Sequence, residues 1–405
     1  MSGQFARNLA SHLERLTVGP PLTGARCGLP GMVAYPVFPR ALDPDPPDVI
    51  TLSEALRCGL RVRDMGVVTR IHVDNPLPAA VFVGESEVLL GPTQLRAVQF
   101  SCLLPAQRRS SLPVSCVQER RPTENQAEFG ASDACPWSVR AAKLVQMTRY
   151  GEPPQTGVWD SIAAYLEQTG TTSPTRDLHA VLERYGPVLQ SLSTAFPRRP
   201  GQVGAIFTVG HEVYMEVFGE PEIFEDRYPL VLRSALIEAV ARPDDVVVPP
   251  EQIPLFLQQV VVASQATRLL DARSLKAEGR PLVFATPSVA GSALVVHGRL
   301  LHLAARQQCP GMAEPGLPLQ AELEAQGARW EAENAGLLEG LRTAYGPRRQ
   351  RYEAYKDRLQ AAARAPAPES PAAARPPAAL QDAPPRPLPL SEPLYAFFSR
   401  LFSRS

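Results

Sequence analysis

The sequence predicts an α+β fold. In this fold an antiparallel β-sheet region with inserted helices is followed by an appended C-terminal helical segment and a disordered Pro/Ala-rich tail. Short segments rich in β-branched residues and separated by turn residues fill positions 60–117 and return after position 203. Apolar residues at helical spacing occupy 137–192 and 311–364. Ten of the 43 prolines lie between residues 365 and 393, and a segment of that composition cannot bury a core.

The charge balance and the lengths of the apolar runs argue against two broad classes of protein. The 405 residues, of which 44% are hydrophobic, suffice for two or three ordinary domains. The 41 basic and 41 acidic residues cancel. General nucleic-acid binding is therefore not expected, because dedicated nucleic-acid binders carry a basic excess. No apolar run reaches the roughly eighteen residues that a spanning helix needs, so we expect no transmembrane segment.

The N-terminus and the cysteines indicate a cytoplasmic protein. The first residues carry a charge every few positions and lack the apolar stretch of a secretory signal. The six cysteines are widely spread and form no Cys-x-x-Cys pair. We therefore expect reduced thiols, and neither a disulfide framework nor a zinc site. We predict no cofactor and no metal.

The chain divides into five predicted parts. A lead-in with a short amphipathic helix and loops rich in Gly and Pro precedes the main α+β domain. An appended helical segment, a disordered linker and an aromatic docking peptide follow that domain. The predicted boundaries are 1–46, 47–310, 311–364, 365–393 and 394–405.

The first half of the main domain combines strands with helices. The strands between Leu60 and Val117 are predicted to form one antiparallel sheet with meander connections. Helices are predicted at 137–147 and 158–168. A third helix is predicted from Ser173, a good N-cap, to about Leu192.

The second half begins with a predicted hairpin, whose strands at 203–209 and 212–217 meet at a Gly-His turn. An apolar helix at 228–240, another helix at 254–264 and four strands between 266 and 304 complete the domain. In the appended segment, a helical stripe from Leu319 to Tyr345 is predicted to break at Gly346-Pro347 and to resume at 348–363.

The last twelve residues carry apolar side chains at helical spacing: Leu394, Phe397, Phe398, Leu401 and Phe402. An aromatic helix on a flexible tether is typical of a docking peptide, because the tether lets it search while the apolar face supplies affinity. We therefore predict a protein partner for residues 394–405. Affinity purification with and without residues 365–405 tests this, and an unchanged set of partners would count against it.

Polar side chains cluster at strand ends in the first β region. Glu85 follows one predicted strand, and Gln94 and Arg96 precede the next. A carboxylate, a carboxamide and a guanidinium suit a phosphorylated or ribose-bearing ligand, since Arg offers a bidentate fork and Glu accepts ribose hydroxyls. The alternative is a buried Glu–Arg pair that fixes the turn.

Catalytic candidates are few. A hydrolase would use Cys116, next to Ser115 at a strand end, as nucleophile and His302 as base. The alternative is an inert thiol buried in a sheet and a histidine satisfied within a strand. The sequence holds no phosphate-binding loop, dinucleotide-binding turn or nucleophile elbow, so no reaction is predicted.

Several of these residues belong to a set of short motifs along the chain: Gly84-Glu85, Gly91, Gln94-Leu-Arg96 and Pro113–Val117, and later Gly201–Gly204, Val217–Gly219 and Ser234. Over residues 47–304 this pattern resembles the domain family named for its association with ADP-ribosylglycohydrolases and rhodanese/phosphatase-superfamily proteins. The resemblance implies a role near ADP-ribose, NAD-derived nucleotide or phosphate metabolism. It also implies that six residues occupy the family's polar positions: Glu85, Gln94, Arg96, Ser115, Cys116 and Arg121.

The sequence departs from the family pattern at several positions. Leu95, Gln118, Arg120 and Pro122 replace Asn, Glu, Gly and Trp, while Ala235 and Glu238 replace an aromatic residue and Asp. The resemblance therefore implies that a candidate general base or metal ligand is missing at Gln118, which favours binding over catalysis.

The leading hypothesis is a cytosolic module that binds a small phosphorylated or ADP-ribose/nucleotide-like ligand. Its predicted ligand-binding residues are Glu85, Gln94, Arg96, Ser115, Gln118 and Arg121. One alternative is a non-catalytic scaffold that recruits a partner through residues 394–405. The other is a hydrolase with a Cys or carboxylate catalytic group.

Overall fold

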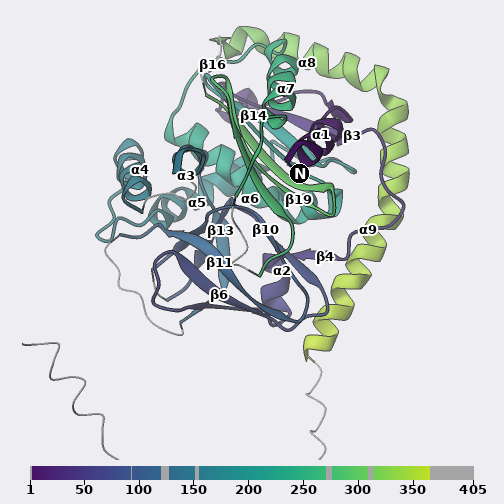
Figure 1. Ribbon diagram of the computed structural model, residues 1–405. Helices are drawn as coiled ribbons and strands as arrows, with labels where there is room; N and C mark the ends of the chain where they lie inside the picture. The colour runs from purple at the N-terminus through teal and green to yellow at the C-terminus, as the bar shows by residue number, and fades with distance from the viewer. Residues whose placement is uncertain are drawn as a thin grey trace, which may run out of the picture. The chain divides into compact units, whose positions relative to one another are not determined.

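In the computed structural model, a nine-stranded antiparallel sheet organises the chain (Figure 1). Its strand order is β1-β3-β14-β15-β20-β19-β18-β17, and β2 pairs with β3 outside this path. The strands are β1 (Leu16–Val18), β2 (Leu22–Thr23), β3 (Met32–Pro39), β14 (Gly204–Val209), β15 (Glu212–Phe218), β17 (Arg268–Leu269), β18 (Arg280–Ala285), β19 (Val289–Val296) and β20 (Arg299–Gln307). The hairpin predicted around residue 210 is confirmed as β14–β15.

The structure describes residues 2–92, 94–119, 127–150, 155–270, 276–308 and 313–364. The predictions for Arg121 and for residues 365–405, including the docking peptide, lie outside these ranges. The contacts between residues make the chain up to Arg364 one compact unit. The predicted lead-in supplies β1, β2 and β3 to the nine-stranded sheet of that unit.

Helices cover both faces of the nine-stranded sheet. Because side chains alternate along a strand, one set of apolar residues packs with α1 (Ser2–Leu13) and α7 (Gln252–Ser264). The other set packs with α6 (Pro221–Ala241), which is buried along most of its length. The apolar helix predicted at 228–240 is thus confirmed as the C-terminal part of α6.

A second β region with its own apolar core spans residues 49–134. Three strands form one sheet: β4 (Val49–Thr51), β7 (Ala80–Val83) and β10 (Cys102–Leu104). Seven strands form another: β5 (Arg61–Asp64), β6 (Arg70–Asn75), β8 (Glu87–Leu90), β9 (Arg96–Val98), β11 (Arg108–Cys116), β12 (Glu128–Phe129) and β13 (Ala131–Ala134).

The prediction of a single antiparallel meander in this region is wrong. The strands divide between two sheets, and β4 runs parallel to β7. A parallel pair requires a long crossover. Here α2 (Leu52–Arg57), β5 and β6 supply it. The strand pattern in the sequence begins at Leu60, after β4, so it could not indicate that β4 pairs in parallel with β7.

Three helices follow the second β region: α3 (Trp137–Tyr150), α4 (Gln155–Gln168) and α5 (His179–Ser193). Their existence is confirmed, but the predicted start of α5 at Ser173 is wrong. The Ser173 hydroxyl accepts a hydrogen bond from the Asp177 amide at 2.9 Å and holds a turn there. Local side-chain bonds of this kind compete with helix formation.

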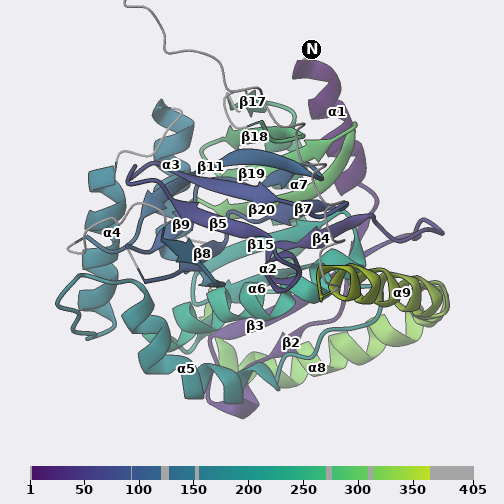
Figure 2. The ribbon, with the colours of Figure 1, turned by 90° about the horizontal axis from the view of Figure 1, so that it is seen from below.

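The appended segment forms α8 (Gly316–Glu333) and α9 (Ala335–Arg364), with the break at Asn334 and not at Gly346-Pro347. Pro347 lies inside α9, and its side chain is exposed to solvent. The opposite face of α9 is buried against the rest of the protein. Buried Tyr345 and Arg348 flank Pro347. Tertiary packing therefore outweighs the proline's local penalty. Figure 2 shows α9 end-on beside α2 and β4.

Three short elements complete the described structure: the 3-10 helix η1 (Ala25–Cys27) and the paired strands β16 (Val246–Val247) and β21 (Glu314–Pro315). The α+β prediction is confirmed by this arrangement. Among the helices within the described ranges, none has the length and apolarity that a membrane crossing requires.

Candidate functional site

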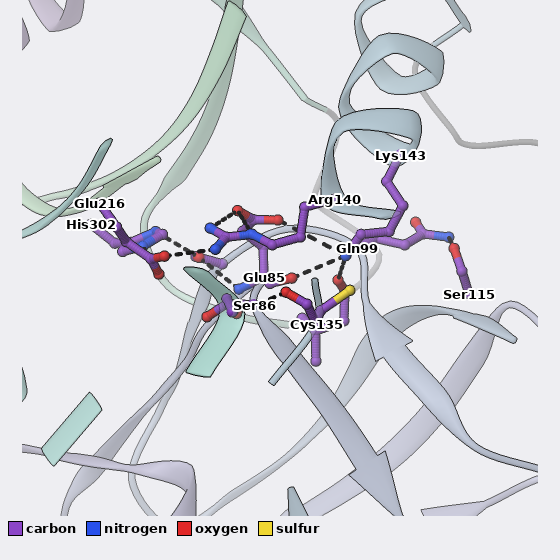
Figure 3. Close-up of polar contacts among 12 residues, drawn as sticks. Glu85, Ser86, Gln99, Ser115, Cys135, Arg140, Lys143, Glu216 and His302 are labelled. Atoms are coloured by element: carbon purple, nitrogen blue, oxygen red, sulfur yellow. Dashed lines mark hydrogen bonds and ion pairs between the residues drawn. The ribbon is translucent and has the colours of Figure 1, made fainter. Parts of the chain in front are cut away.

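A buried polar network joins the second β region to the nine-stranded sheet (Figure 3). Arg140 of α3 lies between two carboxylates, with Nη2 at 2.5 Å from Glu85 Oε1 and Nη1 at 2.7 Å from Glu216 Oε2. His302 of β20 continues the network: its Nε2 lies 3.1 Å from Glu216 Oε1, and its Nδ1 lies 2.9 Å from Ser101 Oγ. The Ser101 hydroxyl in turn accepts a hydrogen bond from the Glu85 amide.

The network balances its own charge. Lys143, one helical turn after Arg140, donates to the carbonyls of Glu85 and Val98 at 3.0 and 2.6 Å. Two cations therefore face the carboxylates of Glu85 and Glu216, and all four side chains are buried. Buried charges must be paired and hydrogen-bonded to be tolerated. We define these six residues as the Glu85 network: Glu85, Ser101, Arg140, Lys143, Glu216 and His302.

The pKa of Glu216 is lowered by its pairing with Arg140 and His302. Burial by itself would raise the pKa, but Arg140 and His302 overcome it and hold the pKa at about 2, against an ordinary value of 4.5. Because the folded pKa lies below the unfolded one, the stabilisation is complete above about pH 4.5 and is lost as the pH falls towards 2.

Glu216→Gln isolates this contribution. We expect the gap in unfolding free energy between the wild type and this variant to narrow by about 3 kcal/mol as the pH falls from 6 to 2. Urea unfolding at a series of pH values measures it. Glu183→Gln, on a side chain that is 70% exposed, is the control and should show no such narrowing. A constant gap for Glu216→Gln would show that Glu216 is not held ionised by its partners.

A second buried cluster contains most of the other predicted ligand-binding residues. Arg96 lies 3.3 Å from the Asp64 carboxylate and donates to the Gln94 side-chain carbonyl at 2.8 Å. Gln94 then donates to the Gln118 backbone carbonyl at 2.8 Å. The Gln118 amide group reaches Thr175 at 2.9 Å. The structure thus brings Gln94, Arg96 and Gln118 together, and it bonds Glu85 to Arg140 instead of Arg96.

Cys116 and His302 take part in different networks. The Cys116 thiol is buried and donates to the Gln118 carbonyl at 3.0 Å. Burial raises the pKa of this thiol, which lowers the fraction of reactive thiolate. Ser115 is also buried, and its hydroxyl accepts a weak hydrogen bond from Gln99 at 3.5 Å.

A third buried cluster fixes the turn between β7 and β8. Glu87 accepts a hydrogen bond from the Gly84 amide at 2.9 Å and pairs with Arg227 of α6, also at 2.9 Å. Arg227 further donates to the Ser86 hydroxyl. A Cβ atom at Gly84 would lie only 3.3 Å from the Arg227 guanidinium, so a small residue suits this position.

A protein-family model covers residues 25–306, well over half of the chain. The chain belongs to the ARG and Rhodanese-Phosphatase-superfamily-associated Protein domain family. Searches of curated proteins and of solved structures gave no match. In this ARPP-1 domain, the Gly84-Glu85 turn, Gln94, Arg96 and β11 all lie at the three buried clusters described above.

The partners of these residues in the ARPP-1 domain were missed by sequence reasoning. The sequence could have indicated Glu216 as a buried polar residue, because it is a charged residue within the otherwise largely apolar strand β15. The indication for Arg140 and Lys143 was weaker: the two cations lie three residues apart on α3 and therefore on the same side of the helix. Asp64 and Arg227 had no distinguishing signal, because isolated charges are common in strands and helices of this length.

Two of the pockets in the described part of the chain differ in their capacity for a ligand. A narrow crevice lined by Glu85, Gln99, Trp137 and Arg140 encloses about 10 Å³, which is room for roughly one water. The other pocket has a volume of about 750 Å³. It lies where α1, the end of β3, the junction of β15 with α6 and the β19–β20 turn meet, and Arg348 of α9 also lines it. We call it the basic pocket.

The basic pocket of this ARPP-1 domain carries an excess of positive charge. Four arginines line it (Arg15, Arg40, Arg299 and Arg348), against one aspartate and one glutamate, Asp43 and Glu220. A positive excess remains even when Glu222, which pairs with Arg348 behind the pocket, is added. His12 also lines the pocket. Burial, and then the charges of Arg15 and Arg299, lower the pKa of His12.

Proposed function

We propose that this ARPP-1 domain is a binding module for a small phosphorylated ligand, which occupies the basic pocket. The observation that carries the proposal is a pair of exposed arginines, Arg15 and Arg40. Within the described ranges of the chain, no carboxylate lies within ion-pair distance of either one. The Arg40 amide donates to the Arg15 carbonyl at 3.2 Å, so the two residues are adjacent.

Chemistry and size both support this assignment. Arginine presents a planar fork that matches phosphate oxygens, and such charge-assisted hydrogen bonds are the strong ones. A volume of about 750 Å³ falls within the range of roughly 300–1,000 Å³ that is typical of small-molecule sites. The buried clusters around Glu85 and Arg96 have matched charges inside the protein, which favours a structural role for them.

Removal of both arginines tests the proposal. ADP-ribose, ADP and inorganic pyrophosphate serve as probes in calorimetric titrations. We expect Arg15→Ala combined with Arg40→Ala to weaken the affinity for a bound probe by about tenfold or more, because each charge-assisted hydrogen bond contributes about 1.5–3 kcal/mol. Both side chains are exposed, so the unfolding free energy should change by less than about 1 kcal/mol.

Arg108→Ala combined with Arg109→Ala is the matched control. It removes the same charge from an exposed stretch of β11 outside the pocket and should leave the affinity unchanged. Failure of all three probes to bind, or equal losses in the two double variants, would contradict the proposal.

ADP-ribose as the ligand, recruitment of a partner through residues 394–405, and a hydrolase activity all stay predictions from the sequence. The same holds for a cytoplasmic location and for ligand contacts by Glu85, Gln94, Arg96, Ser115, Gln118 and Arg121. In a hydrolase of the predicted kind, Cys116→Ala would abolish any measured hydrolysis.

A further inference from the structure

The basic pocket has two chemically different parts. In the first, Arg15 and Arg40 offer guanidinium groups that have no carboxylate partner among the described residues. In the second, Arg299 of the β19–β20 turn is shared between two carboxylates. It pairs with Asp43, and its Nη2 lies 3.2 Å from Glu220 Oε1. A ligand that fills the pocket therefore meets two arginines without a described carboxylate partner in one part, and carboxylates that are already ion-paired in the other.

The second part still has hydrogen-bond acceptors to offer. Asp43 is 60% exposed, and Arg299 engages its Oδ2 atom. No donor to its Oδ1 atom occurs among the residues that the structure describes. Among the described residues, Glu220 Oε1 accepts a hydrogen bond only from Arg299, while its Oε2 accepts from Arg348 at 2.7 Å. An ionised carboxylate accepts through about four lone-pair sites, so both groups retain acceptor capacity.

Charge decides which ligand group suits these acceptors. Arg299 and Arg348 already form ion pairs with both carboxylates, so a cationic group would have to compete with two arginines there. A second phosphate is disfavoured, because it would approach carboxylate oxygens. Neutral hydroxyl donors remain: they can hydrogen-bond to Asp43 and Glu220 without displacing the arginines that pair with them.

We infer that the ligand is a sugar phosphate or nucleotide, with its phosphate on Arg15 and Arg40 and its sugar hydroxyls on Asp43 and Glu220. This inference rests on the proposed function and adds the chemistry of the non-phosphate end. It distinguishes the ligand from a simple phosphate and from a compound with phosphates at both ends.

Three probes test the inference in the full-length chain: inorganic phosphate, ribose 5-phosphate and 2-deoxyribose 5-phosphate. We expect ribose 5-phosphate to bind about tenfold more tightly than phosphate, and the deoxy compound to lie between them. Asp43→Asn should weaken ribose 5-phosphate binding relative to phosphate binding, so that the preference for the sugar phosphate is reduced or lost. The variant should stay folded, because Asp43 is largely exposed. An unchanged melting temperature verifies this.

The failure of this inference differs from the failure of the proposed function. If all three probes bind with equal affinity and the Arg15/Arg40 double alanine variant loses that binding, the pocket binds phosphate and the assignment of hydroxyls to Asp43 and Glu220 is wrong. If none of the three binds, both conclusions fall together. If Asp43→Asn weakens phosphate and ribose 5-phosphate equally, Asp43 has no role in reading the sugar.

Discussion

Arg140→Met should destabilise the protein by about 3–5 kcal/mol, because it leaves Glu85 and Glu216 buried without their shared cation. Both carboxylates lie within 3 Å of the guanidinium, and all three side chains are nearly inaccessible to solvent. Methionine fills part of the vacated volume, so most of the loss comes from unpaired charge and little from a cavity. Urea unfolding at neutral pH measures the change.

Two controls separate charge from volume. Arg342→Met removes an arginine from an exposed pair with Glu339 and should change the unfolding free energy far less than Arg140→Met does. The triple variant Arg140→Met, Glu85→Gln and Glu216→Gln removes the unpaired charges and should recover part of the loss. A single Arg140→Met variant as stable as the wild type would mean that the Glu85 network is open to water or contributes nothing to the fold.

Arg348→Met should destabilise the protein by about 3 kcal/mol and loosen α9. Arg348 is buried, and it forms two hydrogen bonds to the Glu222 carboxylate, at 2.9 and 2.8 Å, and one to Glu220 at 2.7 Å. It also donates to the Asp43 carbonyl. This residue therefore ties α9 to the start of α6 and to the loop before β4. The loss of amide protection in residues 335–364 by hydrogen exchange measures the loosening.

The neighbouring arginine provides the control. Arg349 is 52% exposed and pairs with Glu225, so Arg349→Met should change stability by less than about 1 kcal/mol. The same protection of α9 in Arg348→Met and wild type would show that apolar packing by Leu341, Tyr352 and Leu359 is enough to hold the helix.

Local patterns in the sequence predicted the elements well where packing follows local preference. The β14–β15 hairpin has a Gly at its turn, where φ is positive, and the apolar stretch of α6 is buried as expected. The pattern failed at Pro347, because the buried stripe of α9 holds the helix across a residue that breaks helices locally. The parallel β4–β7 pair depends on a crossover that no short-range signal reveals.

The candidate site was less predictable than the fold, because its residues come from distant parts of the chain. Glu85 was predicted to bind a ligand, with a buried Glu–Arg pair as the alternative. Its partner Arg140 lies 55 positions away and Glu216 lies beyond it. Arg96 donates a hydrogen bond to the side chain of Gln94, two residues away, with which it was expected to converge. Arg15, Arg40 and Arg299 meet only through pairing of strands and packing of α1, so composition and spacing gave no indication of the basic pocket.

A phosphorylated ligand in the basic pocket should change the titration of His12. This histidine lines the basic pocket, and burial together with Arg15 and Arg299 lowers its pKa. A bound phosphate would oppose those positive charges and favour the imidazolium form. Proton NMR of the imidazole signal, assigned with a His12→Gln variant, measures the pKa with and without saturating ribose 5-phosphate. We expect the His12 pKa to rise on binding. Saturable binding with an unchanged His12 pKa would contradict this expectation and place the ligand elsewhere.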